Sequence, residues 1–301
     1  MALLEQLARR QFLVVTGKGG VGKTLVTALL GRLLSQAGRR VLLLEVDPRA
    51  NLHELTGTPP SAGDIVQVGA GQYLQNLRPR YVMEQVVRDH LRVDMLVRRV
   101  VASPVFQHFV DAAPGLKEMS ILGHAWRILH GMGHEAKLKI ETVVLDAPAT
   151  GHGLSLLTAP LVVSDVINEG PFAEMAGNLA TFIGDPKQTG VVTVTLAEEM
   201  PVQEALELRA ALEARVKRSP ELLVVNGLYP RVPESRRRAV AAHDDLWQRR
   251  RAINERELAR MAAEWRGARV QLPLMPVNRG PELVDALAPR LAEALRTEGA
   301  A

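Results

Sequence analysis

The residues whose types and spacing best suit chemistry are Gly17-Lys18-Gly19-Gly20-Val21-Gly22-Lys23-Thr24. An apolar run, Phe12 to Thr16, precedes them, and a helical pattern, Leu25 to Ala37, follows. A strand, a glycine-rich turn and a helix in this order form a phosphate-binding P-loop, because glycines let backbone N–H groups approach an anion at a helix N-terminus. We therefore expect this loop and Leu25 to bind the phosphates of a nucleotide. Lys23 would reach the β- and γ-phosphates, and the Thr24 hydroxyl would bind Mg²⁺.

Two carboxylates follow predicted strands. Asp47 comes after the apolar run Val41 to Glu45, and Asp146 comes after Ile140 to Leu145. The carboxyl ends of parallel strands meet at one sheet edge, where α/β proteins bind their ligands. We expect Asp47 to orient or deprotonate the attacking water, although a turn-forming Asp-Pro is an equal alternative from the local sequence. Asp146 has the Walker-B pattern, in which the acid orients Mg²⁺ directly or through water.

Small residues and an amide complete the candidate site. Ala147 to Gly153 could move with the γ-phosphate as a switch does. Within this stretch, His152 is more simply a structural hydrogen-bonding residue than a catalytic one. Asn226 follows the predicted strand Leu222 to Val225, and an amide can read the adenine edge as both donor and acceptor.

The elements that position these residues predict an α/β fold. Short, continuous apolar runs indicate buried strands of a mostly parallel sheet, and the amphipathic segments between them indicate flanking helices. We expect residues 1–301 to form one P-loop ATPase domain. The strand pattern stops between Leu52 and Lys139, and a last short strand is predicted at Val270 to Leu272.

Helical insertions interrupt the sheet pattern. Apolar residues recur at helical spacing in Tyr81 to Val101 and in Leu116 to Met132, which predicts a helical subdomain at about residues 80–135. Two more helices, Leu154 to Ile167 and Phe172 to Ile183, form a second insertion at residues 154–185. Their apolar faces either pack on one another or line a groove for an apolar client.

Composition narrows the class of protein. The chain has 301 residues, 47% of them hydrophobic, and a net charge of +4. Because acids accompany the arginines of Arg231 to Arg266, a solvated helical arm is favoured there and nucleic acid is an unlikely partner. The chain has no cysteine, which excludes disulfides and thiolate metal sites. With neither a signal peptide nor a long apolar run evident, we expect a cytoplasmic protein, with peripheral membrane association as an alternative.

Lys18, next to the first glycine, resembles the deviant Walker A motif of the dimerising ATPases. That class includes the septum-site and partition ATPases, nitrogenase iron protein and the arsenical-pump ATPases. Three stretches are similar to the family of arsenical pump-driving and tail-anchored-protein targeting ATPases within it: Asp47 to Leu52, Asp146 to His152 and Ala112 to Glu118. Shorter matches extend the resemblance over nearly the whole chain: Leu196 to Pro201, Val225-Asn226 and Leu272 to Leu274.

The resemblance implies roles for five residues. Lys18 would cross a dimer interface to the partner's nucleotide. There we expect it to act with Lys23 in catalysis, because phosphoryl transfer needs positive charge at the γ-phosphate. Asp47 would belong to switch I and aid hydrolysis. Asn226 and Pro273 would cradle the adenine, and Asp146 would belong to switch II.

This sequence also departs from the family pattern. It lacks the cysteines that bind arsenite or an interfacial zinc in some members, so neither ligand is expected. Ala50 stands where the family usually has histidine. The chain has one P-loop, so Lys18 can act in trans only in a homodimer or in a heterodimer with a paralogous ATPase.

The function that we predict is an Mg-ATP-dependent dimeric switch. It would handle an apolar helix or membrane-protein client, or energise a membrane partner. The alternatives are a positioning ATPase that binds DNA or a membrane surface, and the cytosolic ATPase subunit of an anion pump.

Overall fold

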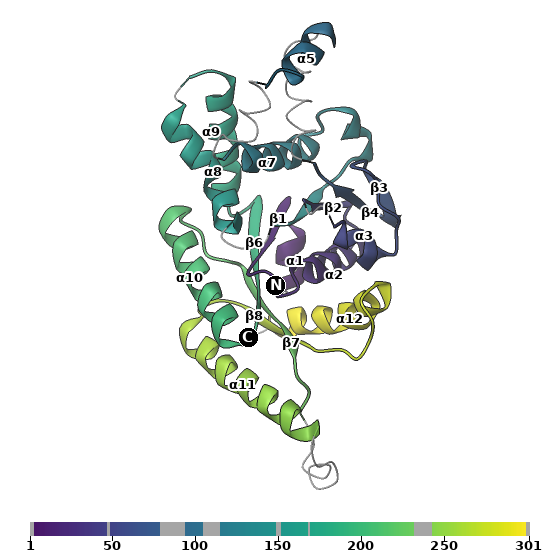
Figure 1. Cartoon of the computed structure of the whole chain (residues 1–301), viewed down its shortest axis with the longest axis vertical. Helices are drawn as coiled ribbons and strands as arrows, with labels where there is room; N and C mark the ends of the chain where they lie inside the picture. Colours follow the sequence, from purple (N-terminus) through teal and green to yellow (C-terminus); the bar gives the residue numbers. More distant parts are fainter. Residues whose placement is uncertain are drawn as a thin grey trace.

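The computed structural model describes residues 3–46, 49–78, 94–104, 115–148, 152–167, 169–231 and 243–298. Its centre is an eight-stranded sheet in the order β3-β4-β2-β5-β1-β6-β7-β8 (Figure 1). Neighbouring strands are parallel except for the antiparallel pair β3 and β4. The strands are β1 (Phe12–Thr16), β2 (Val41–Glu45), β3 (Val66–Gly69), β4 (Gln72–Asn76), β5 (Thr142–Asp146), β6 (Thr189–Leu196), β7 (Leu222–Leu228) and β8 (Arg269–Pro273).

Helices cover both faces of this sheet (Figure 1). They are α1 (Leu3–Ala8), α2 (Lys23–Gln36), α3 (Asn51–Thr56), α5 (Asp94–Val101), α7 (Leu116–Leu129), α8 (His152–Val166), α9 (Pro171–Gly184), α10 (Glu199–Arg215), α11 (His243–Glu264) and α12 (Pro281–Glu298), with a 3₁₀ turn at His134–Leu138. The mostly parallel α/β architecture that the sequence predicts is confirmed.

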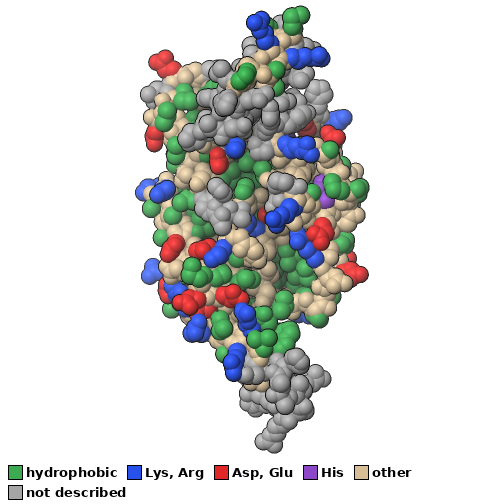
Figure 2. Space-filling model, in the orientation of Figure 1, with side chains coloured by type: hydrophobic (Ala, Val, Ile, Leu, Met, Phe, Trp, Pro, Cys, Tyr) green, Lys and Arg blue, Asp and Glu red, His purple; other side chains and the backbone are tan. Residues whose placement is uncertain are grey.

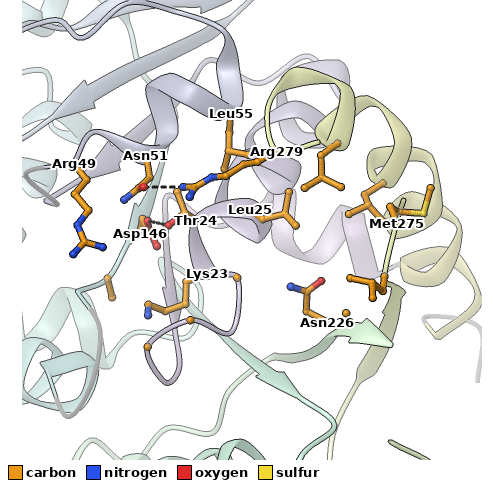
Figure 3. Close-up of a pocket in the computed structure, with 18 of the residues that line it drawn as sticks. Lys23, Thr24, Leu25, Arg49, Asn51, Leu55, Asp146, Asn226, Met275 and Arg279 are labelled. Carbon is orange, nitrogen blue, oxygen red and sulfur yellow. Dashed lines mark hydrogen bonds between the residues drawn. The ribbon is translucent and has the colours of Figure 1, made fainter. Parts of the chain in front are cut away.

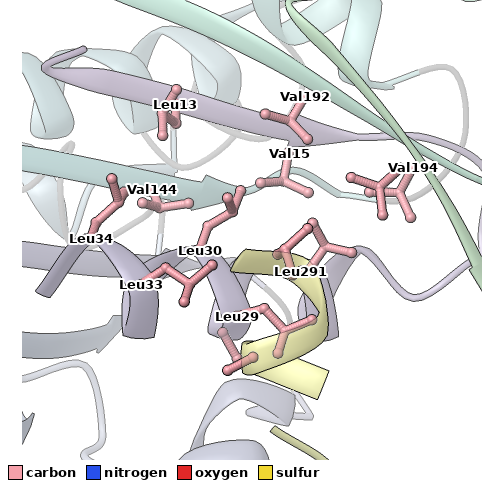
Figure 4. Packing of buried hydrophobic residues seen from close by; sticks show 14 of the residues in the cluster. Leu13, Val15, Leu29, Leu30, Leu33, Leu34, Val144, Val192, Val194 and Leu291 are labelled. Atoms are coloured by element: carbon pink, nitrogen blue, oxygen red, sulfur yellow. The ribbon is translucent and has the colours of Figure 1, made fainter. Parts of the chain in front are cut away.

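Side chains along β1 point alternately to the two faces of the sheet, and each face is covered by a layer of helices. Leu13 and Val15 face α2 and α12, where they join the cluster shown in Figure 4. Phe12 and Val14 face the opposite layer, which includes α7, α8 and α9. All four side chains are fully buried, as expected for a parallel strand covered on both faces. Burial of each such side chain contributes about 1.5–3 kcal/mol.

Strand register places Asp146 beside the loop that follows β1. β1 lies between β5 and β6, and Val15 pairs with Asp146. Glu45, the last residue of β2, also pairs with Asp146. The carboxyl ends of β1, β2 and β5 therefore meet at one edge, directly beside the loop that follows β1.

The expected absence of strands between Leu52 and Lys139 is wrong, because β3 and β4 lie there. Only two of the five residues of β4 are apolar, so no apolar run marks it in the sequence. Its buried Gln75 is satisfied by hydrogen bonds: Nε2 donates to the Gly63 carbonyl at 3.0 Å, and Oε1 lies 2.7 Å from His124 Nε2. Hydrogen bonding thus permits burial of a polar strand.

The helices expected between strands are present. α5 and α7 lie between β4 and β5, and α8 and α9 lie between β5 and β6. The helix expected over Tyr81 to Val101 is described only from Asp94, since residues 79–93 lie outside the described part of the chain. Two predicted strands are longer than expected, so that Asn226 and Pro273 lie within β7 and β8 and not after them.

Candidate functional site

The loop between β1 and α2 has a backbone that requires glycine at two positions. Gly17 has φ 145°, and a Cβ there would collide with the Val194 carbonyl oxygen. Gly22 has φ 95°, and a Cβ there would collide with the Asn226 side-chain amide. The loop is thus packed closely between β6 and β7, and α2 starts at Lys23 with its N-terminus at the loop.

A cavity of about 820 Å³ lies over this loop (Figure 3). Its lining includes predicted residues from four elements: Gly19, Gly20, Gly22, Lys23, Thr24, Leu25, Asp146, Asn226 and Pro273. The volume suits a small-molecule ligand such as a nucleotide. The structure therefore brings together most of the residues that the sequence singled out.

Lys23 and Thr24 lie at the end of the cavity that the P-loop borders, which we call the phosphate end because a phosphate is expected there. The Lys23 side chain is buried and its ammonium donates to the Lys18 carbonyl at 3.1 Å, so it lies back over the loop. The Thr24 hydroxyl donates to Asp146 Oδ2 at 2.6 Å (Figure 3). A hydroxyl and a carboxylate from separate elements thus converge at the end of β5.

Oxygen donors of this kind fit Mg²⁺, which is commonly held by one or two carboxylates together with substrate phosphates and water. Among the described residues, no group of three or more His, Asp or Glu side chains is placed to hold a metal ion. Thr24 and Asp146 would hold Mg²⁺, and the remaining ligands would come from phosphate and water.

Lys18 lies apart from the nucleotide cavity. Its ammonium is 2.7 Å from Glu204 Oε1 of α10. Both residues line a second cavity, of about 360 Å³, together with Gly153 and Glu207. In the single chain, therefore, Lys18 and Lys23 line different cavities although both belong to the P-loop motif.

The other end of the nucleotide cavity is apolar. Asn226 and Pro273 line it with Leu274, Met275 and Val277. Asn226 Nδ2 donates to the Val21 carbonyl at 3.0 Å, which ties β7 to the P-loop. An amide has a second N–H and a carbonyl oxygen with which to bind a base edge. This end has the chemistry of a base pocket.

Sequence reasoning assigned no site role to three polar residues that line the same cavity: Arg49, Asn51 and Arg279. Arg279 Nη2 donates to Asn51 Oδ1 at 2.7 Å, and its Nε lies 3.1 Å from Glu54 Oε2 (Figure 3). The segment before α12 is thereby fixed to α3. The sequence signal for them was weak: Arg49 and Asn51 belong to the stretch Asp47 to Leu52, but no pattern marks Arg279.

Several predicted residues lie outside the described part of the chain. These are Asp47 and Pro48 of the expected switch I, Ala149 to Gly151 of the expected switch II, and Ala112 to Pro114. His152 begins α8. The roles expected for Asp47 and the switches therefore stay predictions.

A central parallel sheet, a loop that requires glycines and a Thr24–Asp146 pair define an α/β P-loop nucleotide-binding protein. A model of the anion-transporting ATPase family matches residues 10–179, which is more than half of the chain. The chain belongs to this family, which confirms the resemblance found in the sequence.

Curated relatives agree with this family assignment. The ATPase BagA of Mycobacterium tuberculosis is 28% identical over 201 residues, covering 64% of this chain and 58% of the relative. An arsenical pump-driving ATPase of Escherichia coli is 26% identical over 287 residues, covering 89% of this chain and 47% of the relative. The ATPase ASNA1 homolog 2 of Paramecium tetraurelia is 24% identical over 162 residues, covering 53% of this chain and 47% of the relative. The chain thus spans about half the length of these relatives.

Proposed function

We propose that this chain is an Mg-ATP-dependent ATPase. The observation that carries the proposal is the 2.6 Å contact between Thr24 and Asp146 at the phosphate end of the cavity. Bound Mg²⁺ would supply charge neutralisation between the β- and γ-phosphates. Lys23 and the backbone N–H groups of the loop bind phosphate oxygens and stabilise charge that builds on them during transfer. Asp47 orients the attacking water.

We further infer that the active form is a dimer in which Lys18 acts at the partner's nucleotide. The separation of the two lysines supports this, because Lys18 is bound to Glu204 and lines a cavity other than that of Lys23. Nucleotide would then favour the closed dimer by binding it more tightly than the separate chains.

An apolar helical client suits the surface of α8. Leu161, Val162 and Val166 are exposed there, with Val166 at 77%. None of the helices in the described part of the chain could span a membrane. We propose that they contact an apolar helix or a membrane-protein segment.

The alternative of a DNA-binding positioning ATPase has less support. Arginines of α11 pair with acids: Arg251 with Glu255 and Arg260 with Glu264, both at 3.0 Å. Basic and acidic side chains are interspersed over α10 and α11 in Figure 2. The second candidate function is the ATPase subunit of an anion pump, which the name of the arsenical pump-driving relative supports. Stimulation of the ATPase activity by oxyanions would support this candidate.

The test measures ATP hydrolysis and solution mass with Mg-ADP, alone and with beryllium fluoride as a γ-phosphate mimic. We expect the wild type to hydrolyse ATP and to dimerise when the γ-phosphate mimic is present. Lys18→Ala should lose this nucleotide-driven dimer closure. Asp47→Asn should bind ATP but not hydrolyse it. A Lys18→Ala chain that dimerises and turns over normally would exclude the trans role.

The client is tested with a peptide of about 20 apolar residues. Binding should weaken in Val162→Asp but not in Leu246→Asp, a matched change at an exposed position of α11. Equal binding by both variants would exclude α8 as the client surface.

A further inference from the structure

Arg49 lies at the phosphate end of the nucleotide cavity. It follows β2, whose carboxyl end faces the cavity, and it lines the cavity with Lys23, Thr24 and Asp146. In Figure 3 its side chain leaves the backbone beside Asn51 and points toward the side of the cavity where Lys23 lies. The residue is exposed where it lines the cavity.

The backbone that carries Arg49 is fixed immediately after it. Ala50 has left-handed angles, φ 50° and ψ 48°, which are strained for an L-residue. The Leu52 N–H donates to both carboxylate oxygens of the fully buried Glu45, at 3.2 Å each. Asn51 accepts the hydrogen bond from Arg279. Strained backbone held in place by its surroundings is typical of functional sites.

The charges of the cavity divide between its ends. Among the described residues three cations line it: Lys23, Arg49 and Arg279. Arg279 is bound to Asn51 and paired with Glu54, so its charge is directed at α3. Lys23 and Arg49 are the cations on the phosphate side. A guanidinium suits this place because its planar fork binds two phosphate oxygens at once.

We propose that Arg49 is a further catalytic residue, whose guanidinium binds the γ-phosphoryl group of ATP and stabilises the charge that builds on it during hydrolysis. This rests on the proposed ATPase function. In the reaction a water oxygen bonds to the γ-phosphorus, and the bond to the β–γ bridging oxygen breaks with its electron pair remaining on ADP. One water proton stays on inorganic phosphate and the other goes to solvent, while Arg49 remains protonated throughout.

The test is Arg49→Ala, with Arg32→Ala as the matched control. Arg32 lies outside the nucleotide cavity, is 43% exposed and pairs with Asp285 at 2.7 Å. We expect kcat of Arg49→Ala to fall about 100- to 1,000-fold, the range for losing one such donor. Affinity for Mg-ADP should change by less than about threefold, whereas affinity for Mg-ADP with beryllium fluoride should fall about tenfold or more. Arg32→Ala should retain kcat within about twofold.

Arg49→Lys separates charge from geometry. It keeps the positive charge but loses the fork, so its kcat should lie between those of the wild type and Arg49→Ala. Because Arg49 is exposed, both variants should keep the wild-type melting temperature within about 2 °C, which checks the fold.

Two results would overturn the proposal: kcat of Arg49→Ala within about threefold of the wild type, or equal losses of affinity for ADP and for the γ-phosphate mimic. A wild-type chain without ATP turnover would instead refute the proposed ATPase function, and this inference with it. A wild type that turns over beside an unaffected Arg49→Ala would refute this inference alone.

Discussion

The ammonium of Lys18 lies 2.7 Å from the carboxylate of Glu204, so the lysine is held by α10 of its own chain. Both side chains are partly exposed, 30% and 37%, and water therefore screens the attraction. A pair of this kind contributes at most about 1 kcal/mol. If Lys18 acts at a partner's nucleotide, the pair must break first, so Glu204 opposes closure of the dimer.

Glu204→Gln should therefore strengthen dimerisation. We expect the dimer dissociation constant with Mg-ADP and beryllium fluoride to fall about two- to fivefold per Lys18 released, measured by sedimentation. Glu207→Gln is the control, because Glu207 lines the same cavity but accepts from Gln203 at 2.7 Å. A weaker dimer in Glu204→Gln would mean that Glu204 supports the interface and does not hold Lys18 back.

Asp146→Asn should uncouple nucleotide binding from magnesium. The neutral amide keeps an acceptor for the Thr24 hydroxyl but loses the charge that favours the ion. We expect kcat to fall about 100-fold or more, and ATP affinity to become similar with Mg²⁺ and with EDTA, measured by calorimetry. Thr24→Ser, which keeps the hydroxyl, serves as the reference. Unchanged magnesium dependence in Asp146→Asn would contradict its role.

Gly22→Ala and Gly20→Ala should differ in stability. Both glycines have positive φ, 95° and 83°, which costs alanine about 1–2 kcal/mol. Only at Gly22 would the methyl group also collide with Asn226 and disturb its bond to Val21, adding about 1 kcal/mol. Denaturant unfolding should show the larger loss in Gly22→Ala, and equal losses would mean that the P-loop adapts freely.

Stability should fall on acidification because of His124. Burial lowers the pKa of His124 from 6.5 to about 4, and the smaller charge effects of Glu135 and Arg127 oppose each other. Between these values the unfolded chain binds more protons than the folded one. The contribution is therefore complete above about pH 6.5, is lost as pH falls, and is gone below about pH 4.

The matched variant for this effect is His124→Gln. We expect its unfolding free energy to change about 2–3 kcal/mol less than that of the wild type between about pH 7 and about pH 4.5. Urea unfolding at the two pH values measures the difference. Parallel losses in both proteins would assign the acid sensitivity to other groups.

Sequence patterns single out the residues around the P-loop that the structure brings together, because the chemistry of these residues is local. Backbone geometry around Gly17 and Gly22 restricts residue type, and Asp146 ends an apolar strand. The contacts of Arg279 with Asn51 and of Lys18 with Glu204 could not be predicted in this way. Each contact joins side chains far apart in the chain that are at least partly exposed, and none of these residues belongs to a periodic pattern. β4 was missed for a related reason, since the burial of Gln75 depends on Gly63 and His124.

The bond between Asn226 and Val21 has a consequence for the whole chain. It joins a late strand to the P-loop, and a nucleotide seated in the same cavity would touch both segments. Such a ligand would join these two distant parts of the polypeptide through non-covalent contacts that are lost when it dissociates. At a concentration of about a hundred times its Kd, the nucleotide would raise the free energy of separating β7 from the P-loop by about 2.7 kcal/mol. Resistance to proteolysis would then report how much of the protein carries nucleotide.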